Sequence, residues 1–415
     1  MQAPEPDTPI QPSGNPRLIE ILVECIRREG PIPFSRFMEI ALYHDAHGYY
    51  RDPHRKPGRG GDFITSPELH PFFGFTIARQ IANCWDHLGQ PHHLIVREHG
   101  ASSGVLAYDI IAALSQQAPD VLAALNYRLI DVNEHRAAES RAAMAEAGLS
   151  DTVRIEHPAQ ITPEPGIVLA NEVADALPVH RLVVRNEGLR ELCVGLDPEN
   201  RFIDVETGIS DDVTNADIPE YLQRAGVDIT TLPDGARLDV SPAAATWIRD
   251  ISHHLTRGYA IVIDYGYEAS TLYRDHRLEG TVRGYFQHTV TDDPYIRVGE
   301  QDLTAHVDFT WLSQAATTAG MTAIGLTTQA EFLTRLGLGD WLVGLQTEPD
   351  TSLDEYYLAQ GAVYRLIDPA GLGRFRVLGL AKNMGDAPNL LGFTPMAAPK
   401  SNPTASSDER TLRFG

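Results

Sequence analysis

Residues 94–104 read LIVREHGASSG, a short aliphatic run that ends in an acid and leads into small residues. The run predicts a buried strand, and the apolar spacing of residues 105–117 predicts a helix directly after it. Small residues between a strand and a helix let the backbone come close to a ligand, while the start of the helix offers free N–H groups. The segment therefore predicts a Rossmann-like fold with a nucleotide-like ligand at the end of this strand.

The next aliphatic run, residues 127–131, supports this interpretation because it also ends in an acid, Asp131. A carboxylate at the end of the second strand can accept hydrogen bonds from both ribose hydroxyls of a nucleotide. The two signals fit NAD and S-adenosylmethionine alike, and also a tight turn with a surface aspartate. A dinucleotide places its pyrophosphate at this turn, where the carboxylate of Glu98 would repel it, whereas a sulfonium cofactor with a free amino group tolerates carboxylates better. We therefore expect S-adenosylmethionine.

The rest of the chain repeats the alternation of strand and helix. Further strands are predicted at residues 153–155, 166–170, 259–265, 321–326 and 374–382, and helices at residues 134–147, 243–255 and 309–319. Such alternation is typical of a doubly wound parallel sheet, so the expected fold class is α/β. Helices are also predicted before the first strand, at residues 17–28, at residues 35–43 and from residue 66 to about residue 88.

Composition suggests how the chain is divided. Residues 1–15 and 386–415 are rich in Pro and polar residues and are expected to be disordered tails. Residues 16–90 are expected to form a helical N-terminal cap with a lid loop, and residues 91–385 the Rossmann-like core. Within the core, period-two strands and turns predict an inserted β-rich segment at residues 181–240.

Charge and composition exclude several classes of protein. The 56 Asp and Glu residues against 34 Lys and Arg give a formal net charge of −22, which repels nucleic acid and anionic lipid. Three cysteines without a C-x-x-C pair argue against disulfides and a cysteine zinc site, and no histidine spacing predicts a metal. No apolar run approaches the roughly 18 to 20 residues of a membrane span. We expect a cytoplasmic protein that binds neither nucleic acid nor membrane.

Acceptor groups gather directly after the predicted strand at residues 166–170, at the carboxyl edge where ligands bind in such folds. Glu172 is the leading catalytic and substrate-binding candidate, because a carboxylate can orient a cationic acceptor or take up a proton. Asp175 is a second catalytic candidate or the cap of a short helix. Asn171 contacts the cofactor or satisfies the backbone of the loop.

Two other regions supply candidates. The Gly-rich and polar residues 60–68 suit a flexible lid that includes Phe63 as a substrate contact. Tyr49 and Tyr50, with Tyr43 nearby, are expected to shape the substrate mouth, although buried packing is the commoner fate of such residues. Ser66 also fits as the N-cap of a helix. His306, close to an acid, is a further candidate for a general base, and most such histidines are structural.

Four motifs resemble, in order, the signatures of the MidA-like methyltransferases. They are GDFITSPE at residues 61–68, EHGASSG at 98–104, LANEVADALPVH at 169–180 and DLTAHVDF at 302–309. The resemblance covers roughly residues 17–383. The family includes a mitochondrial complex I assembly factor that methylates an arginine. The resemblance implies a class I S-adenosylmethionine-dependent methyltransferase with a helical N-terminal cap.

The resemblance and the strand ends together define the expected cofactor site. Its residues are Asp62, Ser66, Glu98, Gly100, Ala101, Ser102, Gly104, Asp131, Val132 and Asn171. The turn departs from the family pattern E-x-G-P-G-R-G, because Ser102 and Ser103 stand at the last Gly-Arg pair. Ser102 can adopt such a turn, with strain if its φ is positive.

The methyl acceptor has two candidates. The family and the clustered acids favour a protein arginine, whereas the altered turn and the aromatic cap favour a small metabolite, for example an aromatic natural product. The alternative from another class is a non-catalytic assembly factor or chaperone that uses the same fold to hold a partner. A homodimer is compatible with each of these.

Overall fold

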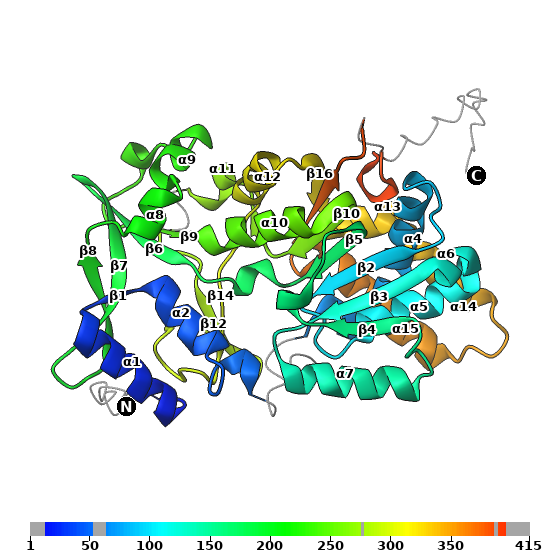
Figure 1. Cartoon of the computed structure of the whole chain (residues 1–415), viewed down its shortest axis with the longest axis horizontal. Helices are drawn as coiled ribbons and strands as arrows, with labels where there is room; N and C mark the ends of the chain where they lie inside the picture. Colours follow the sequence, from blue (N-terminus) through cyan, green and yellow to red (C-terminus); the bar gives the residue numbers. More distant parts are fainter. Residues whose placement is uncertain (1–12, 53–63, 275–277, 386–388, 396–415) are drawn as a thin grey trace, which may run out of the picture.

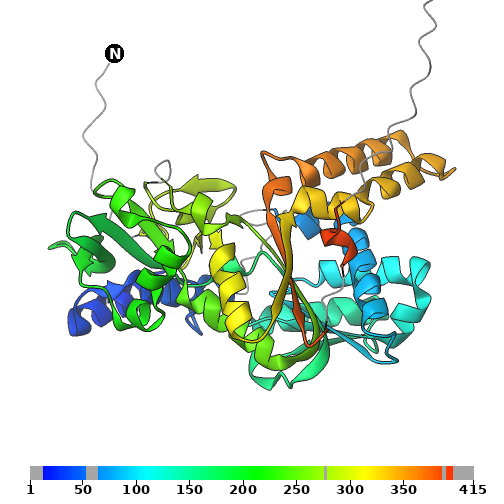
Figure 2. The ribbon, with the colours of Figure 1, turned by 90° about the horizontal axis from the view of Figure 1, so that it is seen from above.

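The computed structural model describes residues 13–52, 64–274, 278–385 and 389–395 of the chain. Figure 1 shows a larger lobe built on a twisted sheet and a smaller lobe that contains the N-terminal helices. Figure 2, seen from above, shows the same two lobes next to each other. The larger lobe carries the α/β core.

The sheet of the larger lobe has, in the described residues, seven strands in the order β16-β17-β10-β5-β2-β3-β4. All neighbours from β10 to β4 are parallel, and β17 is antiparallel to both β10 and β16. The strands are β2 (Leu94–His99), β3 (Leu125–Ile130), β4 (Val153–Glu156), β5 (Glu164–Asn171), β10 (Leu255–Asp264), β16 (Thr322–Thr328) and β17 (Arg376–Lys382). Since β2 lies between β3 and β5, the chain order reverses there, and ligands bind at such switch points.

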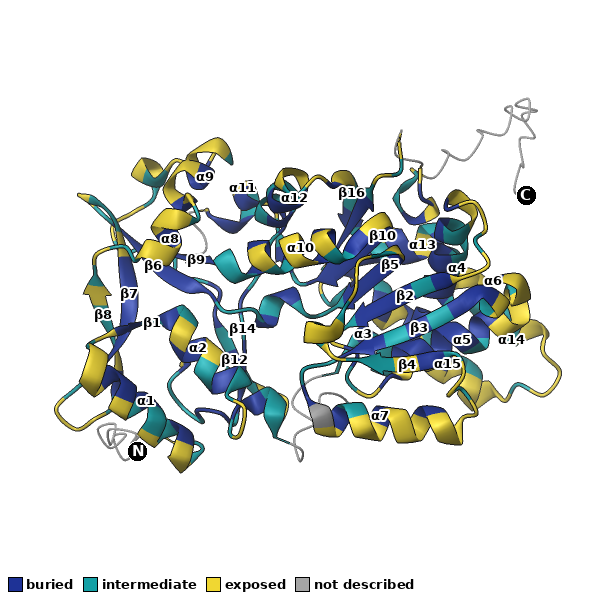
Figure 3. Cartoon of the chain, in the orientation of Figure 1, coloured by how far each residue is buried: buried dark blue, intermediate teal, exposed yellow. Residues whose placement is uncertain are grey.

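Helices cover both faces of this sheet, which confirms the α/β class. In β5, Ile167 and Leu169 pack with α4, α5, α13 and α15, whereas Val168 packs with α10 and α12. Figure 3 shows that the centre of the sheet is buried, and a strand buried on both faces is apolar throughout. The helices of this lobe are α3 (Ser66–Leu69), α4 (Phe72–His87), α5 (Val105–Gln117), α6 (Pro119–Ala124), α7 (Glu134–Glu146), α10 (Pro242–His254), α12 (Phe309–Thr318), α13 (Gln329–Arg335), α14 (Leu338–Thr347) and α15 (Leu353–Ile367).

The smaller lobe is an antiparallel sheet in the order β1-β7-β6-β9, with β8 paired to β7. Its strands are β1 (Ile32–Pro33), β6 (His180–Arg185), β7 (Gly188–Leu196), β8 (Phe202–Thr207) and β9 (Arg237–Val240). One apolar cluster joins it to α1 (Pro16–Glu29) and α2 (Phe34–Tyr43), and another joins it to α8 (Asp211–Asn215) and α9 (Ile218–Arg224). The inserted segment and the N-terminal helices therefore build one unit.

A second excursion from the core, which the sequence analysis did not predict, follows β10. It contains β11 (Gly266–Tyr267), α11 (Ala269–Leu272), β12 (Arg283–Phe286), β13 (Thr289–Thr291), β14 (Asp302–Thr304) and β15 (Val307–Asp308). The hydroxyl of Tyr50 donates a hydrogen bond to Asp302 Oδ1 at 2.8 Å, and that of Tyr43 donates to the carbonyl of Ala176 at 3.0 Å. These bonds tie the small lobe to the excursion and to the loop after β5.

The predicted cap and its third helix differ from the observed elements. The helix expected from residue 66 to about 88 is divided into α3 and α4, because Pro71 has no N–H to continue the first helix. Helix α4 packs on the central sheet, whereas α1 and α2 pack on the small lobe. The cap predicted at residues 16–90 is therefore shared between the two lobes.

The inner ends of both predicted tails are packed on the protein. The side chain of Asn15 caps α1 by accepting from the amides of residues 17 and 18, and its own amide donates to the carbonyl of Val298 at 2.9 Å. Near the other end, Leu390 is fully buried and the ring of Phe393 lies 5.3 Å from that of Phe332. The rest of both tails and residues 53–63 of the predicted lid loop lie outside the described residues.

Candidate active site

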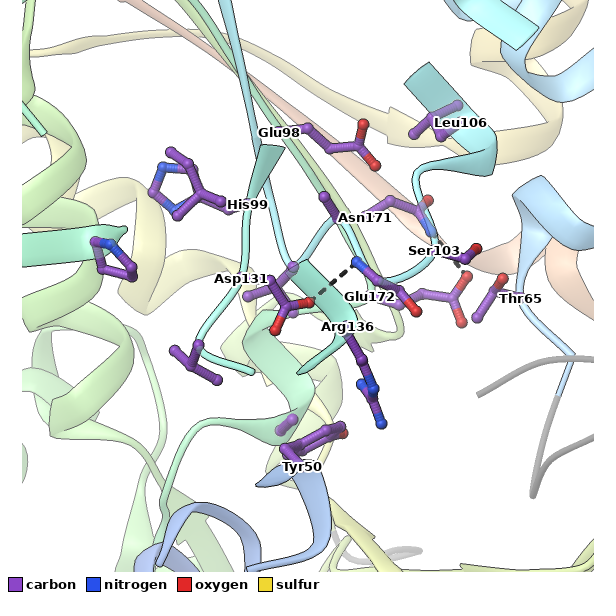
Figure 4. A pocket seen from close by; sticks show the side chains of 18 of the residues that line it. Tyr50, Thr65, Glu98, His99, Ser103, Leu106, Asp131, Arg136, Asn171 and Glu172 are labelled. Carbon is purple, nitrogen blue, oxygen red and sulfur yellow. Dashed lines mark hydrogen bonds between the residues drawn. The ribbon is translucent and has the colours of Figure 1, made fainter. Parts of the chain in front are cut away.

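A cavity of about 340 Å³ lies at the carboxyl ends of β2, β3 and β5 (Figure 4). The predicted cofactor-binding residues that line it are Glu98, Gly100, Ala101, Ser102, Asp131, Val132 and Asn171. The catalytic candidate Glu172 lines it as well. The fold therefore brings the ends of three strands, far apart in the sequence, into one site.

The turn after β2 adopts left-handed backbone at three positions. Gly100 has a φ of 67°, Ser102 of 47° and Gly104 of 77°. A side chain at positive φ crowds the following carbonyl oxygen, so the backbone of Ser102 is strained, as expected for a positive φ at this position. The turn is held in place because the amide of Ser102 donates to Asp131 Oδ2 at 3.1 Å and its carbonyl accepts from Ser140 Oγ at 2.7 Å.

Asp131 follows β3 and links two loops of the site. Its Oδ2 accepts from the amide of Ser102 and its Oδ1 accepts from the amide of Asn133 at 2.7 Å. Burial raises the pKa of this carboxyl, while the two amides and the charge of Arg136 lower it. Each carboxylate oxygen can accept more than one hydrogen bond, so the group can still receive hydroxyls from a ligand in the cavity.

Glu98 is the penultimate residue of β2 and is 4% exposed. Its Oε2 accepts from the hydroxyl of Tyr127 at 2.7 Å. Burial raises the pKa of Glu98 to about 8, and the neighbouring charge of Asp131 adds to the rise. A cationic ligand group beside it would favour the ionised form and gain a charge-assisted hydrogen bond.

Glu172 is held in a strained conformation at the end of β5. Its φ is 56°, and its amide donates to the carbonyl of Ile263 on β10 at 2.9 Å. Its Oε1 accepts from the amide of Ser66 at 3.1 Å and from Asn171 Nδ2 at 2.9 Å. Positive φ at a residue with a side chain persists only where the surroundings enforce it, and it is found often at active sites.

The environment of Glu172 suits proton transfer near neutral pH. Burial raises the pKa of its carboxyl to about 7; hydrogen bonds from Ser66 and Asn171 lower it, and the charges of Asp264 and Glu68 raise it. Asn171 Oδ1 is buried without a hydrogen-bond partner in the part of the chain that the structure describes. A buried acceptor of this kind is normally satisfied, so it is available to a donor on a ligand.

Asp264, which ends β10, is a supporting residue that the sequence analysis missed. It is fully buried, and its Oδ2 accepts from the amides of residues 173–175 at 2.7 to 3.3 Å. It therefore fixes the loop that carries Glu172. The signal was present in the sequence, because an acid directly after an aliphatic strand also marks Glu98 and Asp131.

Aromatic side chains form two walls of the cavity. Tyr43 and Tyr50 stack with ring centres 5.3 Å apart, and the guanidinium of Arg136 lies 5.9 Å from the ring of Tyr50. On another side, Trp247 Nε1 donates to His99 Nδ1 at 3.3 Å. Burial lowers the pKa of His99 to about 4, so its ring is neutral and accepts this bond. No motif signalled Trp247 or Arg136 in the sequence.

The structure corrects the predictions for Tyr49 and His306, since neither lines the cavity. Tyr49 is fully buried in the apolar cluster of the small lobe, whereas Tyr50 and Tyr43, expected at the same mouth, line the cavity. His306 packs against Tyr265, with ring centres 4.3 Å apart, and lines a separate, smaller cavity. Neither a substrate contact for Tyr49 nor a general-base role for His306 is supported by this placement.

Asp175 and Ser66 also lie behind the cavity wall. Burial raises the pKa of Asp175 well above its usual range, with the charges of Asp264 and Asp302 adding to the rise. Asp175 does not line the cavity, so its expected catalytic role is not supported by this placement. Ser66 likewise does not line it; its hydroxyl hydrogen bonds to Gln329 Oε1 at 3.2 Å, and its amide supports the catalytic candidate.

Gly104 does not line the cavity. Its φ of 77° favours glycine, and a Cβ atom there would lie 2.9 Å from the flexible end of Met144 and 3.2 Å from Leu129 Cδ1. The two remaining predicted residues, Asp62 and Phe63, lie outside the described residues.

The chemistry of the lining fits S-adenosylmethionine. Asp131 offers a carboxylate for the ribose hydroxyls, and Glu98 with the unpartnered Asn171 Oδ1 offers acceptors for an amino group. Apolar side chains suited to an adenine ring, Leu106 and Ile130, line the same cavity.

The sheet is parallel except for one antiparallel strand, a tight turn follows its first core strand, and an acid follows the second. Together these features define a class I S-adenosylmethionine-dependent methyltransferase. Residues 76–327 match the model of the family described as "Putative S-adenosyl-L-methionine-dependent methyltransferase". The chain belongs to this family, and it is a methyltransferase with S-adenosylmethionine as its cofactor.

Individual relatives agree with this assignment. A crystal structure of a COG1565 superfamily member from Burkholderia thailandensis bound to S-adenosyl-homocysteine is 30% identical, with a TM-score of 0.80, over 92% of this chain and 97% of that one. The protein arginine methyltransferase NDUFAF7 of Homo sapiens and its Drosophila melanogaster homologue are each 28% identical to this chain, over 89% of it and 85% of the relative.

The expectation of a cytoplasmic protein is contradicted by these comparisons, because the curated relatives are named as mitochondrial proteins. Among the described residues, no helix combines the length and the apolar character that crossing a membrane requires.

Proposed function

We propose that the protein methylates the guanidinium of an arginine in an acceptor protein. The acidic lining of the cavity carries this proposal, since five of its residues are acids: Glu68, Glu98, Asp131, Glu172 and Asp250. In the lining that the structure describes, Arg136 is the only arginine or lysine. An excess of carboxylates favours a cationic acceptor. Relatives named as protein arginine methyltransferases support the same choice.

Glu172 is the residue best placed to act on the acceptor. S-adenosylmethionine, when bound, supplies an electrophilic methyl group on its sulfonium. Arginine is protonated at neutral pH, so its nitrogen must lose a proton as the new N–C bond forms and the C–S bond breaks. Glu172 orients the guanidinium by accepting its hydrogen bonds and takes up that proton. Its pKa of about 7 allows this transfer near neutral pH.

The aromatic wall suits the same acceptor. A guanidinium is planar and stacks on aromatic faces, and Tyr43 and Tyr50 present two such rings to the cavity. The guanidinium of Arg136 lies 5.9 Å from the centre of the Tyr50 ring.

A labelling experiment tests the proposal. The purified protein is incubated with methyl-labelled S-adenosylmethionine and, in separate reactions, an arginine peptide, the same peptide with lysine in place of arginine, and a panel of aromatic metabolites. We expect label in the arginine peptide alone, and labelling slower by roughly 10² to 10⁴ when Glu172→Gln is used. Label in an aromatic metabolite but not in the peptide would instead support a small-molecule methyltransferase.

A further inference from the structure

A second, larger hollow adjoins the active-site cavity. It has a volume of about 1000 Å³ and lies between α15 on one side and α3 and α5 on the other. We call it the α15 groove; it is lined among others by Glu68, Val105, Asp109, Glu355, Tyr357 and Leu358. Pro67, Glu68 and Val105 line both hollows, so the groove is continuous with the active-site cavity. Figure 2 shows α14 and α15, in orange, as a helical pair outside the central sheet.

Asp109 gives the groove a buried carboxylate that lacks a partner. The residue is 5% exposed, and its Oδ2 has no hydrogen-bond partner in the described part of the chain. Burial raises the pKa of this carboxyl to about 7. A buried polar group without a partner is costly, and a charged one more so. A cationic group bound in the groove would satisfy it.

Asp109 lies about one helical turn from the border between the groove and the active-site cavity. Val105, at the border of the two hollows, and Asp109 are four residues apart on α5, so they lie on the same face at about 5 to 6 Å between their Cβ atoms. Two residues of an extended chain span about 6.6 to 7 Å. For an extended acceptor whose arginine enters the cavity beside Val105, a side chain two positions away therefore reaches Asp109.

The opposite wall of the groove carries two apolar side chains that no described residue covers, beside the charged Glu355 and Arg365. Tyr357 is 61% exposed and Leu358 72% exposed, although both lie on a helix whose other face is buried against the core. Large exposed aromatic and aliphatic side chains beside a functional cavity are typical of a protein-binding surface. The net charge of −22 opposes binding of a second copy of this acidic chain and favours a basic partner.

We propose that the α15 groove binds the segment of the acceptor protein next to the methylated arginine, with a lysine or arginine two positions away paired to Asp109 and apolar side chains packed on Tyr357 and Leu358. This inference rests on the proposed function, because it names the surface that selects the arginine substrate. It makes Asp109 a specificity residue that does not contact the transferred methyl group.

Peptide binding to the protein saturated with S-adenosylhomocysteine tests the inference. The probes are fluorescent nine-residue peptides with a central arginine, a leucine, and a lysine two positions before or after the arginine; matched probes carry glutamine in place of the lysine. Asp109→Asn should weaken binding of a lysine probe by about tenfold to a hundredfold, the loss of one charge-assisted hydrogen bond, and leave the glutamine probes unchanged.

The apolar wall has its own matched pair of variants. Tyr357→Ala should weaken both kinds of probe by about fivefold or more, as for a buried aromatic contact. Tyr364→Ala is the control, because Tyr364 is 62% exposed on the same helix and does not line the groove. Both side chains are on the surface, so these two variants should fold and can test the inference even if Asp109→Asn does not fold.

The outcomes separate this inference from the proposed function. Binding that follows the expected pattern without methylation of any arginine peptide would support the groove and refute arginine methylation. Methylated arginine peptides whose binding and KM are unchanged in Asp109→Asn and Tyr357→Ala would overturn the groove. An equal loss for lysine and glutamine probes in Asp109→Asn would overturn it too, as would a dimer that Tyr357→Ala dissociates and that excludes the peptides.

Discussion

The backbone amide of Ser66 donates a hydrogen bond to Glu172 Oε1 at 3.1 Å, across 106 residues of sequence. Ser66 begins α3, the short helix that also carries Glu68 into the cavity wall. The bond therefore joins the helix beside the cofactor cavity to the loop that carries the proposed base. It leaves the carboxylate anchored through one oxygen, so substitutions at Glu172 can be designed to keep the anchor and change only the charge.

Glu172→Gln should lower kcat by roughly 10² to 10⁴ while keeping cofactor affinity, because a positioned general base contributes about that much. A glutamine Oε1 can still accept from Ser66 and Asn171, so the loop should hold its shape. Single-turnover methyl transfer at saturating cofactor and a separate titration with S-adenosylhomocysteine measure the two effects. Parental turnover in this variant would remove Glu172 from the chemical step.

The rate should rise with pH through an apparent pKa of about 7, since burial raises the pKa of Glu172 to that value and only the ionised carboxylate accepts a proton. Below this pH the group is protonated and the rate falls. Glu68→Gln should move the profile to lower pH, because the charge of Glu68 contributes to the raised pKa. The pH dependence of kcat/KM measures this shift.

Other groups near Glu172 have pKa values close to its own, so the pH profile needs a control that removes Glu172 alone. Burial raises the pKa of Glu98 to about 8 and that of Asp264 to about 7, and lowers that of His99 to about 4. In Glu172→Gln the rise near pH 7 should disappear from the residual rate. A profile that keeps its shape in this variant would assign the titration to another group, with Asp264 the first candidate.

Asp131→Ala should weaken S-adenosylhomocysteine binding by about tenfold to a hundredfold, the loss expected for charge-assisted hydrogen bonds to a ribose. The structure adds a second cause, because Asp131 also holds the amide of Ser102 in the turn. Isothermal titration calorimetry measures the change. Asp120→Ala, which removes an exposed aspartate on α6, is the control and should bind as the parent does.

Gly100→Ala should weaken cofactor binding and lower the melting temperature, because the new Cβ would lie 2.7 Å from Val173 Cγ2. The sequence alone suggests that a side chain here would meet only the ligand, whereas the structure shows that it also presses on the residue after Glu172. Adding Val173→Ala should restore most of the stability, because it removes the contact with the new Cβ. About 1 to 2 kcal/mol of strain from the positive φ should remain. A double variant that regains the melting temperature but not the affinity for S-adenosylhomocysteine would identify the ligand as the obstacle.

The part of the site that could be predicted from the sequence is local in origin. Glu98 and Asp131 each follow an aliphatic strand, and the small residues after β2 mark a tight turn, so short patterns locate them. Asp264 has the same pattern at the end of β10 and was open to the same argument. The strands of the second excursion, by contrast, are two to four residues long, which is too short for an alternating pattern to be recognised.

The part that could not be predicted depends on tertiary packing. Tyr49 and Tyr50 are adjacent and alike, with rings 5.1 Å apart, yet only Tyr50 reaches the cavity, because the turn directs its neighbour into the small-lobe core. The contact of Ser66 with Glu172 joins segments whose proximity no local pattern reveals. The motif around His306 is intact, but its ring packs on Tyr265 away from the site.

The strained turn offers a prediction that separates conformation from contact. Ser102 has a φ of 47°, whereas Ser103 beside it does not have a positive φ, and both line the cavity. Left-handed backbone costs a residue with a side chain about 1 to 2 kcal/mol, and a glycine costs about 0.5 to 1 kcal/mol in entropy of the unfolded chain.

Ser102→Gly should therefore raise the free energy of unfolding by up to about 1.5 kcal/mol, while Ser103→Gly should lower it by about 0.5 to 1 kcal/mol. Urea unfolding without cofactor measures both variants against the parent. If Ser102 contributes only its backbone amide to Asp131, S-adenosylhomocysteine affinity should be kept or improved in Ser102→Gly. If its hydroxyl binds the cofactor, the variant should be more stable and bind more weakly. A Ser102→Gly protein less stable than the parent would show that its side chain stabilises the turn by more than its backbone conformation costs.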